Sequence, residues 1–257
     1  MTFDKISVAH DGEVATIRID RPDVHNAMDA ETRGEIREAF QAAVDDDGIG
    51  CIVMGSQHGA FSSGADLEAV EAMGAEEVLE FSTSHGEGLY SFVERVPKPT
   101  IAAIDGWALG GGTEISLAFD FRLATTDSKF GLTEMRVGLY PFGGAIQRLT
   151  AHVGAAKAKE LVLGADIIDA EEAEDIGLLT ELHDPEGFDD RVDEFAHELA
   201  GKPQPTYRVA KESFNRAMDL EAGLQFDRVA GPYLLSTDDT REGIEAFLED
   251  REPEYGN

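Results

Sequence analysis

Two glycine-containing turns, each between an apolar run and a helical pattern, restrict this chain to alternating strands and helices. The first turn, Phe61-Ser-Ser-Gly-Ala-Asp66, follows the apolar stretch Cys51-Ile-Val-Met54. The second, Gly106-Trp-Ala-Leu-Gly-Gly-Gly112, follows Pro99-Thr-Ile-Ala-Ala-Ile104. Glycine turns lack Cβ interference, so their backbone N–H groups can point at a ligand oxygen. Two such turns predict two backbone donors for one anionic oxygen.

Two glutamates close glycine-containing turns of this kind. Glu114 ends the segment that begins at Gly106, and Glu134 ends Phe130-Gly-Leu-Thr-Glu134. Carboxylates beside backbone donors are typical of acid/base sites, in which one group accepts a proton and another donates one. Taken singly, Glu114 is equally well a first-turn helix residue favoured by the helix dipole, and Glu134 a solvated loop residue.

The rest of the pattern agrees with an α/β fold. A hairpin is predicted around Asp11-Gly12, and Asp29 is a predicted N-cap for the helix that follows. Helical spacing continues from about residue 75 to 96, and short strands are predicted at 100–104 and 121–124. Strand–helix alternation of this kind favours layered sheets and helices with right-handed crossovers. From residue 143 the pattern is mostly helical.

Composition narrows the class of function. The formal net charge is −31 and the acidic residues are spread along the chain, which predicts an acidic surface that repels nucleic acids and anionic membranes. We expect such a protein to be stabilised by salt, as in a salt-accumulating cytoplasm. There is no run of about twenty apolar residues and no basic-then-apolar leader, so a cytoplasmic protein is predicted. The single cysteine, Cys51, is predicted to be a buried structural thiol, and the scattered histidines predict no metal site.

An ordered set of motifs along nearly the whole chain resembles the crotonase family, which is also called the enoyl-CoA hydratase/isomerase family. This set comprises the two glycine turns and Arg21-Pro22, Asn26-Ala27, Pro97-Lys-Pro99, Phe130-Gly131, Gln147-Arg-Leu149 and Asp239-Thr-Arg-Glu-Gly-Ile244. The resemblance implies a spiral of ββα repeats over residues 1–195, and a C-terminal helical region over 196–257 that forms trimers or hexamers. The apolar stripe Ile244, Phe247 and Leu248 is interpreted either as packing within the chain or as a subunit contact.

The same resemblance implies a site for an acyl-CoA thioester. Its oxyanion hole would be the backbone N–H groups of Ala65 and Gly111, and Ser63, Asp66 and Leu67 would complete the substrate-binding turn. A glutamate at both Glu114 and Glu134 is typical of members that hydrate 2-enoyl-CoA. Glu114 would activate water and Glu134 would protonate Cα. No cofactor is implied beyond the coenzyme A that arrives with the substrate.

Two departures and two rival functions accompany this resemblance. Where the family often carries basic residues that hold CoA phosphates, this chain has Glu68 and Asp250-Arg251, so the phosphate contacts are an open question. Isomerisation of Δ3-enoyl-CoA to Δ2-enoyl-CoA, or another acyl-CoA reaction, would use the same oxyanion hole. A non-catalytic binding protein, including an RNA-binding one, is disfavoured because no basic patch occurs along the chain. Acyl chain length is not predicted.

Overall fold

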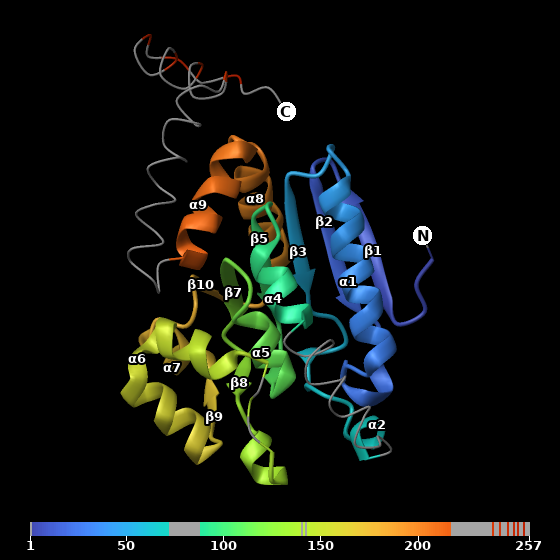
Figure 1. Cartoon of the computed structure of the whole chain (residues 1–257), viewed down its shortest axis with the longest axis vertical. Helices are drawn as coiled ribbons and strands as arrows, with labels where there is room; N and C mark the ends of the chain where they lie inside the picture. Colours follow the sequence, from blue (N-terminus) through green and yellow to red (C-terminus); the bar gives the residue numbers. More distant parts are fainter. Residues whose placement is uncertain are drawn as a thin grey trace.

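The computed structural model of this chain describes residues 2–71, 88–139, 141 and 143–216, with the single positions 238, 242, 246, 249, 251 and 254. Two β-sheets form its frame (Figure 1). The larger sheet consists, in chain order, of β1 (Ile6–Asp11), β2 (Val14–Ile19), β3 (Cys51–Gly55), β5 (Thr100–Ile104), β7 (Phe121–Thr125) and β10 (Glu181–His183). The smaller sheet consists of β4 (Ala60–Ser62), β6 (Trp107–Leu109), β8 (Lys129–Gly131) and β9 (Ile167–Asp169).

Each sheet is mainly parallel. In the larger sheet the spatial order is β1-β2-β3-β5-β7-β10, and only the β1–β2 hairpin is antiparallel. In the smaller sheet the order is β4-β6-β8-β9, and β4, β6 and β8 run parallel. From β3 to β8 the chain therefore visits the two sheets alternately, placing one strand in the larger sheet and the next in the smaller one.

This alternation produces three successive strand–strand–helix units. β3 and β4 lead to α2 (Leu67–Glu71), and β5 and β6 lead to α5 (Gly111–Ser116). β7 and β8 lead to the 3-10 helix η3 (Glu134–Val137) and then to α6 (Ala145–Gly164). Because β4, β6 and β8 are parallel neighbours, the residues that follow them meet at one edge of the smaller sheet. The fold predicted from the family resemblance, a spiral of ββα repeats, is confirmed.

The local sequence explains the first elements. Gly12 follows β1 with a positive φ of 54°, as the predicted hairpin turn requires. The Asp29 carboxylate accepts the backbone N–H of Thr32 at 2.8 Å, so the predicted N-cap of α1 (Ala30–Asp45) is confirmed. Ile36 and Phe40 lie on the buried face of that helix.

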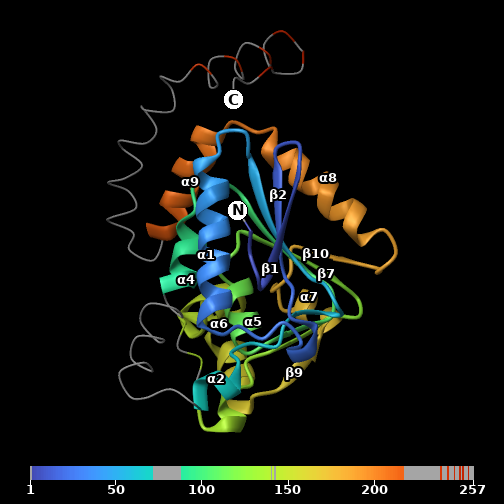
Figure 2. The same ribbon diagram turned by 90° about the vertical axis from the view of Figure 1, so that its right-hand side faces the viewer.

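Helices cover both faces of the larger sheet. Figure 2 shows α1 on one face and α8 (Phe188–Ala200) on the other. The main core lies on the α1 side, together with α4 (Gly88–Arg95), α5 and α6, and a second apolar cluster lies beneath α8. Because both faces are covered, β3 and β5 are buried at every position, which explains their continuous apolar sequences.

The part of the chain after residue 195 begins inside a helix. The predicted division at 195/196 lies within α8, and the division into two regions stays a prediction. Helix α9 (Gln204–Arg216) is anchored by Lys211, whose Nζ donates to Asp120 Oδ2 at 2.6 Å beside the start of β7. The predicted apolar stripe near residue 244 lies outside the described residues. Residues 75–87 of the predicted helix also lie outside them.

The structure adds short elements that the sequence pattern did not reveal. The second glycine turn contains β6, and the first turn begins within β4. Strands of three residues are too short to show a period-2 pattern, and only their pairing across the smaller sheet defines them. Helix α7 (Ala170–Asp175) follows β9 and is capped by the side chain of Asp169.

Candidate functional site

The first glycine turn is held by pairing with the segment before α1. Met28 N–H donates to the Gly64 carbonyl at 2.7 Å, and Asp66 N–H donates to the Met28 carbonyl at 3.2 Å. In this parallel bridge the N–H of Ala65, between the two paired groups, points away from Met28. Among the described residues, the Ala65 amide has no acceptor, so it is available to a ligand.

The second turn approaches the first so closely that only glycine fits. A Cβ placed on Gly64 would lie 2.9 Å from the Gly111 nitrogen, and one placed on Gly112 would lie 2.2 Å from the Ser62 carbonyl oxygen. A Cβ on Gly111 would lie 3.4 Å from the Ala65 nitrogen. The two amides named from the sequence are thus brought side by side, at the ends of β4 and β6.

Glu114 lies in the first turn of α5 and is 6% exposed. Its Oε1 accepts the backbone N–H of Gly143 at 3.0 Å. Burial raises the pKa of Glu114, whereas the Gly143 N–H and the positive charges of Arg33 and Arg148 oppose that rise. This carboxylate is therefore surrounded by groups that favour its anionic form.

Glu134 has the opposite surroundings. It begins η3, and both of its carboxylate oxygens are buried without a hydrogen-bond partner in the described structure. Burial, together with the negative charge of Glu114, raises the pKa of Glu134 to about 7. The two carboxyl groups titrate as a coupled pair, and the nearby positive charges act on Glu114.

Four residues that position these groups were not predicted as site residues: Gly143, Arg148, Arg33 and Tyr90. Arg148 donates to the Gly143 carbonyl at 2.7 Å and forms a bidentate ion pair with Glu94. Arg33 donates to the Tyr90 hydroxyl at 3.0 Å. The sequence could have drawn attention to Arg33. It precedes Ile36 by three positions, so helical spacing places this charged residue on the apolar face of α1.

The remaining predicted substrate-binding residues support the first turn or lie at its edge. Asp66 accepts the N–H of Ala69 at 3.3 Å in α2 and forms an ion pair with Arg21 at 3.0 Å. The Ser63 hydroxyl donates to the Val24 carbonyl at 3.1 Å, which ties it to the preceding segment. Leu67 is 52% exposed at the start of α2.

The side chain of Asn26 fixes the loop before α1. Its side-chain amide donates to the carbonyls of Gln57 and Ala60, and its Oδ1 accepts the N–H of Arg21. The residue has a positive φ of 59°, which these bonds sustain. The Arg21 guanidinium also contacts Asp29 and the Ala27 carbonyl, so it serves the loop and the two helix caps.

Two other features lie apart from this site. Cys51 is fully buried, and burial raises its pKa to about 12, so its thiol stays protonated.

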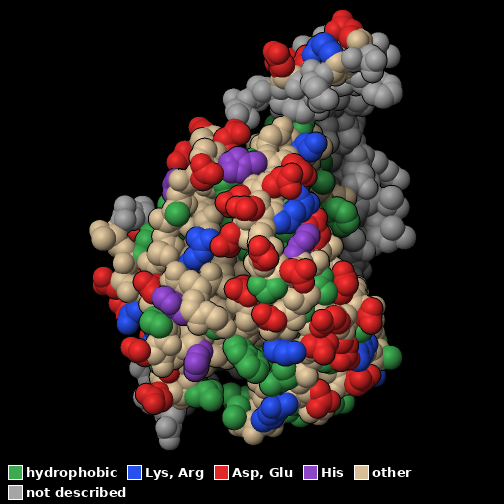
Figure 3. Space-filling model, turned by 180° about the vertical axis from the view of Figure 1, so that it is seen from behind, with side chains coloured by type: hydrophobic (Ala, Val, Ile, Leu, Met, Phe, Trp, Pro, Cys, Tyr) green, Lys and Arg blue, Asp and Glu red, His purple; other side chains and the backbone are tan. Residues whose placement is uncertain are grey.

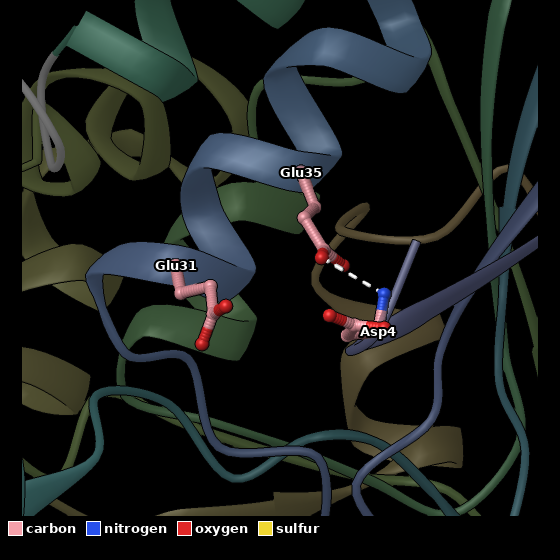
Figure 4. Close-up of side chains that lie close together, drawn as sticks. All are labelled: Asp4, Glu31 and Glu35. Atoms are coloured by element: carbon pink, nitrogen blue, oxygen red, sulfur yellow. Dashed lines mark hydrogen bonds between the residues drawn. The ribbon is translucent and has the colours of Figure 1, made fainter. Parts of the chain in front are cut away.

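Figure 4 shows Asp4, Glu31 and Glu35, whose carboxylate oxygens lie within 4.8 Å of one another. Glu35 accepts the backbone N–H groups of Asp4 and Lys5, and Lys5 Nζ lies 3.6 Å from Glu31. These bonds anchor the N-terminal segment on α1.

No helix within the described residues is both long enough and apolar enough to cross a bilayer.

A spiral of strand–strand–helix units that presents two backbone donors beside two buried carboxylates belongs to an acid/base enzyme that acts on a carbonyl compound.

Comparison with known proteins agrees with this class. The enoyl-CoA hydratase/isomerase family matches residues 9–257. The chain is 34% identical over 258 residues to the crotonyl-CoA hydratase of Syntrophomonas wolfei subsp. wolfei, with 99% of each chain covered. It is 35% identical over 265 residues to the mitochondrial methylglutaconyl-CoA hydratase of Mus musculus, with 99% of this chain and 84% of that one covered.

A solved structure gives the same result. The crystal structure of enoyl-CoA hydratase from Bacillus anthracis matches with a TM-score of 0.92 at 33% identity, over 98% of this chain and 99% of that one. The chain belongs to the enoyl-CoA hydratase/isomerase family, as its sequence motifs predicted.

Proposed function

We propose that this protein is a 2-enoyl-CoA hydratase, which adds water syn across the double bond to give a 3-hydroxyacyl-CoA. The observation that carries the proposal is the unequal carboxylate pair: a backbone N–H and two arginines favour the charged form of Glu114 against burial, whereas burial and the charge of Glu114 raise the pKa of Glu134 to about 7. Hydration needs one group of each kind, because a proton leaves water at one carbon atom and another is delivered at the neighbouring carbon.

In the first half of the reaction, the thioester carbonyl oxygen accepts hydrogen bonds from the N–H groups of Ala65 and Gly111. Glu114 removes a proton from water as the water oxygen bonds to Cβ. The double-bond electrons move onto the carbonyl oxygen, giving an enolate that the two amides stabilise. Each donor of this kind contributes about 3 kcal/mol to the transition state.

In the second half, the enolate collapses and Cα takes the proton of Glu134. Over the whole reaction, Cβ gains the hydroxyl group of one water molecule and Cα gains one hydrogen. Glu114 ends protonated and Glu134 ends ionised, so one proton must return from Glu114 to Glu134 before the next turnover. This chemistry needs no metal or redox group, and we propose that coenzyme A enters only as part of the substrate.

The relatives support a short or branched acyl group as the first substrate to test. Two of them are named crotonyl-CoA hydratase and methylglutaconyl-CoA hydratase. We propose that the CoA phosphates are bound without the usual basic residues, since Glu68 follows the first turn and Arg251 pairs with Glu242 and Glu249. Arg21 is likewise paired, with Asp66 and Asp29.

The test is the loss of crotonyl-CoA absorbance in molar KCl, with wild type compared with Glu114→Gln and Glu134→Gln. We expect rapid loss in wild type and a decrease in kcat of at least about 100-fold in each variant, since general acid/base groups contribute roughly that much. Each variant keeps the shape of the side chain, and circular dichroism in the same buffer checks that it is folded.

Other outcomes would lead to different functions. An isomerase needs only one base to move a proton, so full activity in one of the two variants on a Δ3-enoyl-CoA would favour isomerisation. No turnover of any enoyl-CoA by folded wild type would contradict the proposal. Tight, salt-sensitive RNA binding would favour a non-catalytic role, which the acidic composition opposes.

We further propose that the protein works as a trimer or hexamer in a salt-rich cytoplasm, in fatty-acid or branched-chain amino-acid breakdown. Phe214 on α9 is 78% exposed in the single chain, which supports a subunit contact there. Figure 3 shows acidic side chains spread over one face, with fewer basic ones.

Salt dependence tests the acidic surface directly. We expect the melting temperature to rise by several degrees between 0.1 M and 2 M KCl, because screening weakens the repulsion among surface carboxylates. Thermal unfolding followed by circular dichroism measures this, with NaCl as a second salt at equal ionic strength. An unchanged or lower melting temperature at 2 M would contradict adaptation to salt.

A further inference from the structure

Arg33 is a charged residue at a core position of α1, and only 3% of it is exposed. Burying a guanidinium is costly unless hydrogen bonds and opposite charges compensate for the loss of water. The groups that Arg33 contacts, the Tyr90 hydroxyl and the Met28 carbonyl, each hydrogen-bond to one of the two turns that offer the amide donors. It therefore connects the helix α1 to the candidate site.

One connection runs through Tyr90 to the second turn. Arg33 Nη1 donates to the Tyr90 hydroxyl at 3.0 Å, and that hydroxyl donates to the Gly111 carbonyl at 3.2 Å. The guanidinium carbon lies 5.5 Å from the centre of the tyrosine ring. Tyr90 is completely buried, and burial raises its pKa to about 12, so its hydroxyl keeps the proton that it donates.

A second connection runs toward the first turn. Arg33 Nε lies 3.5 Å from the Met28 carbonyl, which also accepts the N–H of Asp66. Met28 is the residue whose pairing aims the Ala65 amide. A Cβ placed on Gly111 would lie 3.4 Å from Arg33 Nη2 and 3.4 Å from the Ala65 nitrogen. The guanidinium thus lies beside Gly111, whose other neighbour is Ala65, the residue of the first donor.

Charged groups from three elements and one neutral tyrosine surround Glu114. Arg33 approaches from α1, Arg148 from α6 and Glu134 from η3, and Tyr90 of α4 lies between Arg33 and the turn. Arg148 has its own counter-ion, because its guanidinium makes two bonds to Glu94 at 3.0 and 2.9 Å. Arg33 is the cation that also reaches the amide donors through Tyr90.

We propose that Arg33 is a positioning residue of the hydratase site, which holds both amide donors in register through Tyr90 and Met28 and keeps Glu114 in its proton-accepting form. This inference rests on the proposed function. Arg33 does not touch the reacting atoms. It acts through the Gly111 carbonyl on the geometry of the oxyanion turn and through its charge on Glu114.

The experiment compares Arg33→Met, Arg33→Lys and Tyr90→Phe with wild type in crotonyl-CoA hydration across pH. Arg37→Met is the matched control, because Arg37 lies one turn further along the same helix, where it stacks on Phe92 and donates to the Gly88 carbonyl. In Arg33→Met we expect kcat to fall about 30-fold with little change in KM, because positioning acts in the transition state.

The pH dependence separates a charge role from simple packing. Loss of a nearby positive charge should move the acid limb of kcat/KM in Arg33→Met upward by about one pH unit. Arg33→Lys keeps the charge and should restore the position of that limb. Tyr90→Phe keeps Arg33 and should lower kcat about 5-fold without moving the limb. Arg37→Met should stay within about twofold of wild type.

A titration without substrate makes the test independent of the reaction. Carboxyl-carbon NMR of glutamate-labelled protein should show the Glu114 resonance titrating at higher pH in Arg33→Met than in Arg37→Met. An acid limb and a kcat equal to those of wild type in folded Arg33→Met would overturn the proposal, as would an unshifted resonance. If Arg33→Met does not fold, wild-type kcat in Tyr90→Phe overturns it. Failure of wild type to hydrate crotonyl-CoA, with the resonance still shifted, would contradict only the proposed function.

Discussion

The region around Glu114 and the region around Glu134 belong to one site, yet they treat a carboxylate in opposite ways. Glu114 receives a backbone N–H from the loop before α6, and positive charges act on it from α1 and α6. Glu134 is buried beside the charge of Glu114, and its two oxygens have no hydrogen-bond partner among the described residues. The charged form of the same side chain is supported by neighbouring donors and cations in one place and lacks a hydrogen-bond partner in the other.

This difference shows that the local sequence of each glutamate does not set its proton affinity. Both glutamates lie in the first turn of a short helical element that follows a strand of the smaller sheet, Glu114 in α5 after β6 and Glu134 in η3 after β8. The groups that distinguish them, Arg33, Gly143 and Arg148, come from segments far away in the chain. Acid and base roles in this family member therefore depend on tertiary neighbours.

The largest expected effect comes from moving the Gly143 peptide. A Cβ on Gly143 would lie 2.4 Å from two ring atoms of Tyr90 and 3.3 Å from Glu114 Oε1, so the Gly143 peptide must shift. Because Tyr90 is fully buried, we expect Gly143→Ala to lose the hydrogen bond to Glu114 and to lower kcat about 100-fold. Steady-state hydration kinetics measure this loss.

The control for that substitution is Gly34→Ala in α1, where an added Cβ meets no atom within 4 Å. It should keep full activity and gain slightly in stability from its higher helix propensity. Gly143→Ala should also keep the fall in kcat/KM above about pH 7, because the surroundings of Glu134 are unchanged. Normal turnover in Gly143→Ala would show that the Gly143 N–H is not what distinguishes the surroundings of Glu114 from those of Glu134.

The ionisation of Glu134 is expected to affect the free energy of unfolding, by less than Gly143→Ala affects activity. The folded-state pKa of Glu134, about 7, lies above its ordinary value of 4.5, so folding favours the protonated form. Stability is therefore present in full below about pH 4.5 and is lost as the pH rises through about 7. Glu134→Gln cannot ionise, and we expect it to exceed wild type by about 1–2 kcal/mol at pH 8.5 and by much less at pH 5.

Urea unfolding at the two pH values, in constant KCl, measures that difference. Glu114→Gln is the comparison, because it removes a carboxylate that the Gly143 N–H and two arginines stabilise. We expect a smaller gain in stability at pH 8.5 from Glu114→Gln than from Glu134→Gln, because these groups oppose the rise that burial causes in the pKa of Glu114. Equal gains in both variants at pH 8.5 would show that burial alone governs the pair and that the neighbouring cations do not distinguish them.

Much of the fold was predictable because its signals are local. The Asp11-Gly12 hairpin, the Asp29 cap and the strand at 100–104 appear as expected. The smaller sheet was not predicted, because a three-residue strand such as β6 carries no recognisable period. Ala65, Gly111, Glu114 and Glu134 were named from motifs, and the structure brings the two amides and the two carboxylates together.

By itself the sequence determined the family, the two glycine turns and the residue types of the candidate site. These features follow from short segments in which backbone conformation and side-chain chemistry are encoded locally. Only the tertiary structure decided which groups surround each glutamate, since Arg33, Arg148 and Gly143 reach Glu114 whereas Glu134 lies buried beside the charge of Glu114. Burial and electrostatic interaction depend on distances in space, and only the assembled sheets and helices define those distances.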